Sequence, residues 1–196
     1  MPDPTAPHRP GKGPRAAEAI HDATLRLLAE RGYAGLTIEA VAQEAGVNKT
    51  TIYRWWPSKA PLLRAALLHS RALDVSVPDT GSLRGDLIAL TGQIVALVTG
   101  ARTQSLVRAM TAGTGLPDDE LAALTRDFFA DRFSREQPVF ARAVARGELP
   151  ADADPMLLLD LIAGAVWMRA LLRNLPVPPD FAAAVVDAVL PARRTG

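Results

Sequence analysis

The chain has 196 residues, of which 48% are hydrophobic and 22% charged, and its 22 lysines and arginines nearly balance its 21 aspartates and glutamates. This composition is that of an ordinary soluble protein of one or two domains. Because the chain has no cysteine, disulfide frameworks, thiolate metal sites and cysteine nucleophiles are excluded, and nothing indicates an oxidising compartment. We therefore expect a cytoplasmic protein.

Two segments are candidates for a signal peptide and a transmembrane helix, respectively. The first 15 residues hold five prolines and three basic side chains but no apolar run. A signal peptide needs such a run, so residues 1–14 are expected to form a disordered basic arm. The most apolar stretch, Met156 to Met168, is interrupted by Asp160 and Gly164. It falls short of the ~20 apolar residues that cross a bilayer, so we expect no transmembrane helix and no membrane partner.

The first predicted elements are two helices separated by a glycine. Apolar residues recur at helical spacing between Arg15 and Arg31, and Gly32 ends this amphipathic helix. Thr37 is expected to cap a short helix, Ile38 to Ala45, because its side-chain oxygen can accept a hydrogen bond from an early backbone N–H.

A third and a fourth helix follow directly. Gly46 can adopt the positive φ that a tight helix-to-helix turn needs, and Asn48 can cap a helix that runs to about Trp56. Ser58 is expected to cap the next helix, which starts at Lys59.

The rest of the chain keeps the helical period. Helices are expected at about residues 83–101, 104–112, 118–137, 139–146, 155–175 and 180–190, and Pro138 either kinks or ends one of them. No segment shows the period-two alternation of a strand. The predicted fold class is all-α with about nine helices: an N-terminal three-helix domain, residues 15–65, and a larger helical domain, residues 66–196.

The two short helices carry the functional signal. A helix, a short turn containing glycine and a second helix form a helix-turn-helix arrangement. The second helix presents amide, ammonium, hydroxyl, phenol and guanidinium groups, which are the types that bond phosphate oxygens and base edges. These residues are Asn48, Lys49, Thr50, Thr51, Tyr53, Arg54, Trp55 and Trp56. The charge distribution supports DNA binding only weakly, since residues 1–60 carry eight basic and six acidic side chains.

The run from Gly32 to Leu63, GYAGLTIEAVAQEAGVNKTTIYRWWPSKAPLL, resembles the DNA-binding domain of the TetR family of transcriptional regulators. The likeness rests on Gly32-Tyr33, Leu36-Thr37, Ala45-Gly46-Val47, Tyr53, Trp56 and Lys59. The larger domain resembles the family only in plan. The resemblance implies a sequence-specific regulator, most simply a repressor, that binds a palindromic double-stranded DNA operator as a homodimer. A small-molecule effector bound by the larger domain would release it.

The resemblance also implies roles for individual residues. Thr37, Tyr53 and Lys59 would bind phosphates, while Lys49, Thr50, Arg54 and Trp55 would approach bases, with Asn48 and Thr51 beside them. Asn48, Thr50 and Trp56 depart from the residues usual in the family, so the bases that are read stay open. Structural roles are the alternative, above all a purely capping role for Thr37 and a core position for Trp56. The basic arm either touches the minor groove or makes no contact.

In the larger domain, the resemblance implies a ligand cavity and a pairing surface. Met110, Phe128, Phe129, Phe133, Trp167 and Met168 could line the cavity, with ordinary core packing as the alternative. An inward-pointing Arg102, Arg108 or Arg169 would favour an anionic or hydrogen-bonding ligand, because a buried guanidinium needs a partner. The two most apolar helices, Met156 to Leu175 and Asp180 to Leu190, are the expected dimer surface.

Catalytic and cofactor motifs are absent from the sequence. His8, His21 and His69 share no metal-ligand spacing, and there is no nucleophile elbow, P-loop or dinucleotide-binding glycine pattern. We therefore expect no metal, no cofactor and no enzymatic activity. One alternative is an all-helical small-molecule-binding protein or enzyme with a vestigial DNA-binding domain. Another is a helical scaffold that acts only through protein contacts.

Overall fold

The computed structural model describes residues 16–101, 103–112 and 120–190, and every regular element in these ranges is helical. This confirms the predicted all-α class. The basic arm at 1–14 and Arg102 lie outside the described residues. The ten α-helices are α1 (Ala17–Gly35), α2 (Ile38–Glu44), α3 (Lys49–Trp55), α4 (Lys59–His69), α5 (Leu83–Thr99), α6 (Gln104–Thr111), α7 (Glu120–Arg135), α8 (Gln137–Ala145), α9 (Pro155–Trp167) and α10 (Phe181–Val189).

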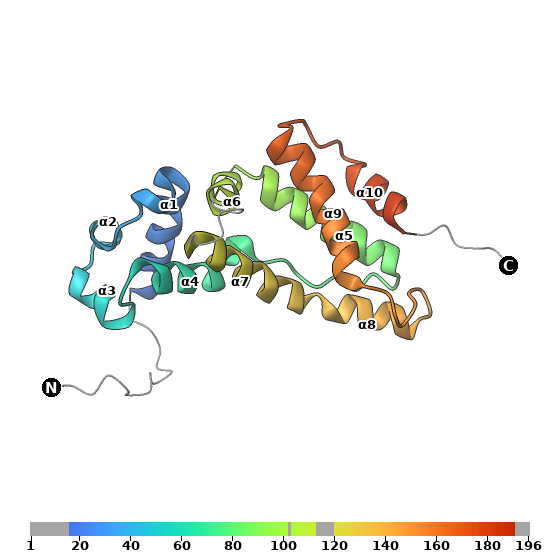
Figure 1. Cartoon of the computed structure of the whole chain (residues 1–196), viewed down its shortest axis with the longest axis horizontal. Coiled ribbons are helices and arrows are strands. Elements are labelled where there is room, and N and C mark those ends of the chain that lie inside the picture. Colours follow the sequence, from blue (N-terminus) through green and yellow to red (C-terminus); the bar gives the residue numbers. More distant parts are fainter. Residues whose placement is uncertain (1–15, 102, 113–119, 191–196) are drawn as a thin grey trace.

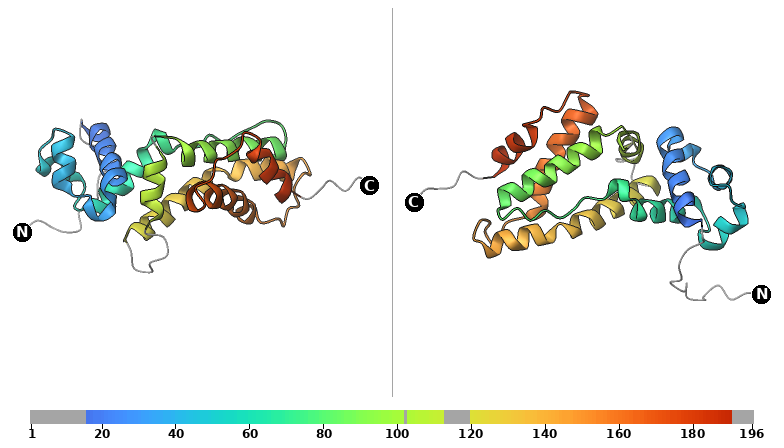
Figure 2. Two further views of the ribbon diagram at one scale, coloured as in Figure 1. Left: turned by 90° about the horizontal axis from the view of Figure 1, so that it is seen from above. Right: turned by 180° about the vertical axis from the view of Figure 1, so that it is seen from behind.

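These helices form an elongated molecule with two ends (Figure 1). Helices α1 to α3 occupy one end, α5, α9 and α10 lie toward the other, and α7 with α8 runs along one side between them (Figures 1 and 2). A 3₁₀ turn, Arg71–Leu73, follows α4, and a π turn, Met168–Leu172, extends α9.

Local signals in the sequence set the boundaries of the short helices. The Thr37 hydroxyl oxygen accepts a hydrogen bond from the Ala40 N–H at 3.2 Å, and the Asn48 side-chain oxygen accepts one from the Thr50 N–H at 3.0 Å. Both bonds satisfy backbone donors that have no partner within the helix. Gly46 has a φ of +66°, which is the left-handed conformation that glycine adopts without strain. The predicted caps and turn of α2 and α3 are therefore confirmed.

Ser58 departs from its predicted role, and the position of Pro138 decides between a kinked helix and two separate helices. Ser58 occupies the position before α4, as predicted. Its side chain makes no capping hydrogen bond, so the prediction that this side chain caps the helix is wrong. Pro138 lies in the first turn of α8, and α7 ends at Arg135. Proline is tolerated in a first turn because its missing N–H would have no intrahelical partner there. The proline therefore separates two helices and kinks neither.

Buried apolar side chains form two clusters. The first joins α1 to α4 with α6 and α7, and includes Leu27, Ile52, Leu63 and Phe128. The second packs the first half of α5 against α8, α9 and α10. One continuous core therefore connects the N-terminal helices to α6 and α7.

Helix α9 has apolar residues on both faces. Leu159, Ile162 and Val166 are buried, and α9 packs against α5 and α10. The opposite face exposes apolar side chains, namely Leu157, Leu161, Met168 and Leu172. By length and composition, Pro155–Leu172 is the one unbroken helix among the described residues that could cross a membrane, with a mean hydropathy of 1.7 and 28% of its residues buried. The core helix of a soluble protein meets the same criteria, so the absence of a membrane span stays a prediction.

One buried acidic residue, Glu136, lies between the end of α7 and the start of α8. Glu136 is 5% exposed, and its Oε2 atom has no hydrogen-bond partner. Burial raises the pKa of Glu136 to about 7 because the ionised form loses its hydration. The folded protein therefore holds this proton more tightly than the unfolded chain does. Its contribution to the free energy of unfolding falls as pH rises from the ordinary value of 4.5 through about 7.

We predict that Glu136→Gln stabilises the protein in alkali and has little effect in acid. At about pH 8 the variant removes a buried carboxylate, and the free energy of unfolding should rise by roughly 1–3 kcal/mol, whereas at about pH 5 the difference should be near zero. Urea denaturation at both pH values measures this. Glu30→Gln, at an exposed position of α1, is the control that should change neither value. Equal effects of Glu136→Gln at the two pH values would contradict the prediction.

Candidate nucleic-acid interface

Helix α3 is attached to the domain by one side and presents polar groups on the other. Ile52 is completely buried among the residues of α1, α2 and α4. The exposed face carries Lys49, Thr50, Tyr53 and Arg54. Residues three or four positions apart are neighbours on a helix surface, as Lys49 is with Tyr53 and Thr50 with both Tyr53 and Arg54. The four side chains therefore form one surface, and α3 lies at the outer end of the molecule (Figure 1).

The remaining predicted contact residues surround this surface. Asn48 and Thr37 are exposed at the starts of α3 and α2, where both also act as caps. Thr51 is half-buried. Lys59 is engaged within the protein: its Nζ donates a hydrogen bond to the Tyr33 carbonyl oxygen at 2.9 Å and lies 4.1 Å from the centroid of the Tyr33 ring.

An acidic residue that sequence reasoning did not place here lies against the α3 surface. Glu39 Oε1 is 3.7 Å from Lys49 Nζ and 3.5 Å from the Tyr53 hydroxyl, which donates to it. In the sequence, Glu39 is recognisable only as a first-turn acid that complements the α2 dipole. Its proximity to Lys49 depends on the angle between α2 and α3. Glu39 thus occupies two groups that a phosphate oxygen could bind.

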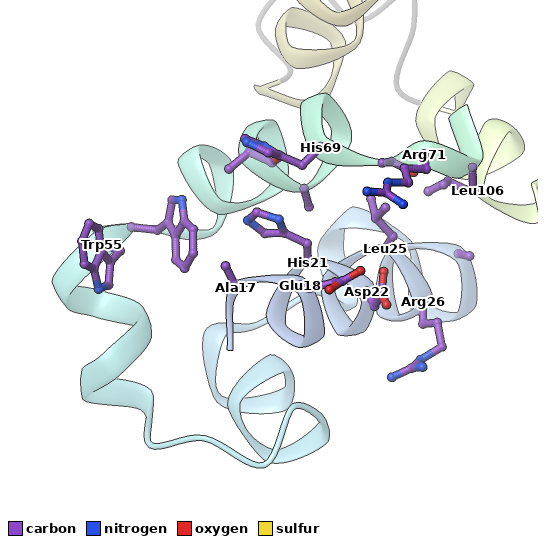
Figure 3. A pocket seen from close by; sticks show the side chains of 16 residues that line it. Ala17, Glu18, His21, Asp22, Leu25, Arg26, Trp55, His69, Arg71 and Leu106 are labelled. Carbon is purple, nitrogen blue, oxygen red and sulfur yellow. The ribbon is translucent and has the colours of Figure 1, made fainter. Parts of the chain in front are cut away.

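Trp55 is the last residue of α3, and Trp56 is the residue that follows it. Both line a groove of about 1050 Å³ between α1 and α4. Figure 3 shows His21 of α1 and His69 of α4 within this groove and Trp55 at its end. The ring centroids of His21 lie 5.3 Å from Trp56 and 5.2 Å from His69. Trp56 is half-buried against the N-terminal core, and Trp55 is half-buried as well.

The two histidines meet although they are distant in the sequence. Burial and the neighbouring His69 lower the pKa of His21, and Asp22 acts in the opposite direction. His8 lies outside the described residues. Among the residues that the structure does describe, no three His, Cys, Asp or Glu side chains are arranged to hold a metal ion.

Comparison with known proteins places the chain in a family. Residues 20–66 match the family model of bacterial regulatory proteins of the tetR family, and residues 77–189 match that of the tetracyclin repressor-like C-terminal domain. An uncharacterized HTH-type transcriptional regulator of Mycobacterium tuberculosis is 37% identical over 177 residues, which cover 90% of this chain and 86% of that protein. The chain belongs to the TetR family of transcriptional regulators.

Further relatives agree with this assignment. The DNA-binding transcriptional repressor TetR of Mycobacteroides abscessus is 34% identical over 183 residues, which cover 91% of this chain and 94% of that protein. The crystal structure of a TetR family transcription regulator is 34% identical with a TM-score of 0.69, and covers 89% of this chain and 95% of that chain. The chain is thus a DNA-binding transcriptional regulator with the helix-turn-helix that the sequence predicted.

The larger domain of this TetR-family regulator contains a cavity of about 70 Å³ among α5, α6, α7 and α9. Met110, Phe128, Phe129, Phe133 and Trp167 line it. Met168 does not, because it lies on the exposed face that it shares with Leu161, and it is 51% exposed.

Of the three arginines considered for an inward position, Arg102 lies outside the described residues, and the other two do not reach the cavity. Arg108 donates to the Leu171 carbonyl oxygen and Arg169 to that of Pro176, and neither lines the cavity. Arg132 and Glu136 line it instead. The signal was present in the sequence, because Arg132 follows Phe128 by four residues and so shares its side of α7, and Glu136 comes directly after the end of α7.

We predict that Glu39→Gln strengthens binding to DNA of any sequence. Removing the carboxylate frees Lys49 from its ion pair and takes one negative charge from the exposed surface beside α3. An exposed ion pair is worth about 0.2–1 kcal/mol, so affinity at low salt should rise by roughly twofold to fivefold, with a smaller gain at high salt. Fluorescence anisotropy with a random duplex at two salt concentrations measures this. Asp152→Asn, an exposed position between α8 and α9, is the control of equal charge. Unchanged or weaker binding by Glu39→Gln would refute the prediction.

Proposed function

We propose that this TetR-family regulator is a cytoplasmic repressor that binds a palindromic operator as a homodimer and releases it when a small molecule occupies the larger domain. The observation that carries the proposal is the outward polar surface of α3, whose opposite side is held by the buried Ile52. In this proposal residues 15–65 bind DNA and residues 66–196 bind the effector and the second subunit. The proposed activity needs no metal, cofactor or catalytic group.

Helix α3 would enter the major groove of the operator. Arg54 is the strongest candidate for base reading, because an arginine can bond two acceptors of one guanine. Lys49 and Thr50 lie beside it on the same exposed face. Tyr53 and Thr37 present hydroxyls that would bind phosphates, and Lys59 would reach a phosphate from the start of α4. Phosphate contacts fix the position of the protein on DNA, while base contacts provide specificity.

A homodimer would supply the second reading helix. One helix-turn-helix unit buries too little surface for tight specific binding, and two units on a palindrome solve this. The exposed apolar face of α9 and its π turn is the best-supported pairing surface. Gly164 is exposed on that face, between Leu161 and Met168, and so allows close approach of a second helix. α10 packs against α9 and would extend the surface.

Release would follow from displacement of α7. The Tyr33 hydroxyl, at the end of α1, donates a hydrogen bond to Glu120 at the start of α7. α4 also packs against α7. A ligand that binds better when α7 is displaced would therefore change the position of the N-terminal helices. A ligand of equal affinity for both arrangements would change nothing.

Selection of binding sites from random DNA tests the proposal. The wild-type protein should enrich a palindrome, and Arg54→Ala should lose preference at one base pair in each half-site, with a loss of about 1–3 kcal/mol for each contact. Arg126→Ala, which removes an equally exposed arginine from α7, should keep the wild-type preference. Enrichment of no palindrome by the wild-type protein would leave the proposed repressor without support.

The pairing surface is tested by charge substitution. Leu161→Glu places a carboxylate in the centre of the exposed α9 face, where its desolvation on pairing would be costly, so the protein should sediment as a monomer. Val144→Glu makes the same change at an exposed apolar position on α8 and should leave the dimer intact. Analytical ultracentrifugation measures both. A Leu161→Glu protein that remains dimeric would place the interface elsewhere.

A further inference from the structure

The cavity of the larger domain has flat aromatic walls. The ring centroids of Phe129 lie 5.4 Å from Phe128, 6.0 Å from Phe133 and 5.1 Å from Trp167. The volume of about 70 Å³ is below the ~300 Å³ at which pockets for drug-sized molecules begin. A ligand larger than a few atoms must therefore displace a wall, and three of these four aromatic residues belong to α7.

Two polar side chains in this cavity have unused hydrogen-bonding atoms. Arg132 and Glu136 are 6% and 5% exposed and both line the cavity. Arg132 bonds to Asp74 through Nη1, while its Nε and Nη2 have no partner. Glu136 Oε2 has none either. Burying a polar atom without a hydrogen-bond partner is unfavourable, so such atoms in a folded protein need an explanation.

The charges around the cavity restrict the chemistry of a ligand. Asp74 already balances the positive charge of Arg132. The uncompensated group is Glu136, whose pKa burial raises to about 7. An anionic ligand would be repelled by ionised Glu136. It would gain little attraction from Arg132, because Asp74 already balances the charge of that arginine. A cation would satisfy Glu136 and leave the Arg132 donors unused.

We infer that the ligand of this cavity is a neutral aromatic molecule whose ring carries a hydrogen-bond acceptor beside an N–H donor, as in an aromatic amide or lactam. The acceptor binds the free N–H groups of Arg132, the donor binds Glu136 Oε2, and the ring lies against Phe129 and Trp167. Both polar side chains are then satisfied without adding charge to the cavity. This inference rests on the proposed function of the larger domain as a ligand-binding domain.

Isothermal titration calorimetry of the full-length protein tests the inference with four probes that share one ring system. 2-Naphthamide has both acceptor and donor, 2-acetonaphthone only the acceptor, 2-naphthoate an anionic acceptor and 2-naphthylmethylamine a cationic donor. We expect 2-naphthamide to bind roughly tenfold or more tightly than each of the other three. No detectable binding of 2-naphthamide, equal affinities or preference for a charged probe would overturn the inference.

Substitutions of Glu136 and Arg132 test which side chain binds the donor of the probe and which binds its acceptor. Glu136→Leu should remove the advantage of 2-naphthamide over 2-acetonaphthone, whereas Glu136→Gln keeps a side-chain carbonyl acceptor and should retain it. Arg132→Met should weaken both probes by roughly tenfold, because both use the acceptor contact. Arg126→Ala on the exposed side of α7 is the matched control. Circular dichroism confirms that each variant is folded, and unchanged probe preference in folded Glu136→Leu would overturn the assignment.

A separate measurement distinguishes this inference from the proposed repressor mechanism. Anisotropy of the selected operator duplex, with and without saturating 2-naphthamide, reports DNA release. If 2-naphthamide binds with the expected preference but does not change operator affinity, the cavity chemistry stands and the release mechanism fails. If operator binding is established and 2-naphthamide shows no preference in calorimetry, the mechanism stands and the cavity chemistry fails.

Discussion

The packing of Ile52 beneath α3 is the contact on which the DNA-binding surface depends. Helix α3 has only seven residues, and a helix this short is unstable in water without tertiary support. The buried Ile52 holds it against the other N-terminal helices, and the caps of Asn48 and Thr37 fix where α3 and α2 begin. With one side of α3 attached, its polar side chains are directed outward as one rigid surface. Base reading requires this rigidity, because a misplaced donor loses its acceptor.

Helix α7 connects that surface to the larger domain. Its first residue, Glu120, bonds to Tyr33 at the end of α1. Farther along, Phe128, Phe129 and Arg132 line the cavity. A ligand that moves the cavity end of this helix acts on the same continuous core that supports α1 and α4. By linkage, DNA that favours one position of α7 must change ligand affinity by the same factor.

Two acidic residues occupy positions that are unfavourable either for attraction to DNA or for the stability of the fold. Glu39 faces Lys49 and Tyr53 on the DNA-binding side, and Glu136 is buried in an apolar cavity with one oxygen unpartnered. Natural proteins depart from the rules of stable packing mainly at functional sites. Glu39 contacts Lys49 and Tyr53, which are groups that a phosphate oxygen could otherwise bind. Glu136 gives the cavity a polar atom that only a ligand with a suitable donor satisfies.

The helical class, the helix-turn-helix and the caps of α2 and α3 could all be predicted from the order of the residues. These features depend on residues within about one turn of each other, such as Thr37 with Ala40 or Asn48 with Thr50, so neighbouring residues suffice to specify them. The family resemblance then supplied the kind of function. The side chains that meet across helices, by contrast, are known only from the packing of the folded chain. The angles between helices bring Glu39 to Lys49 and His21 to His69, direct Met168 outward, and bury Arg132 in place of the arginines first considered. Periodicity shows that a helix has an apolar side, but the packing of distant elements determines what covers it.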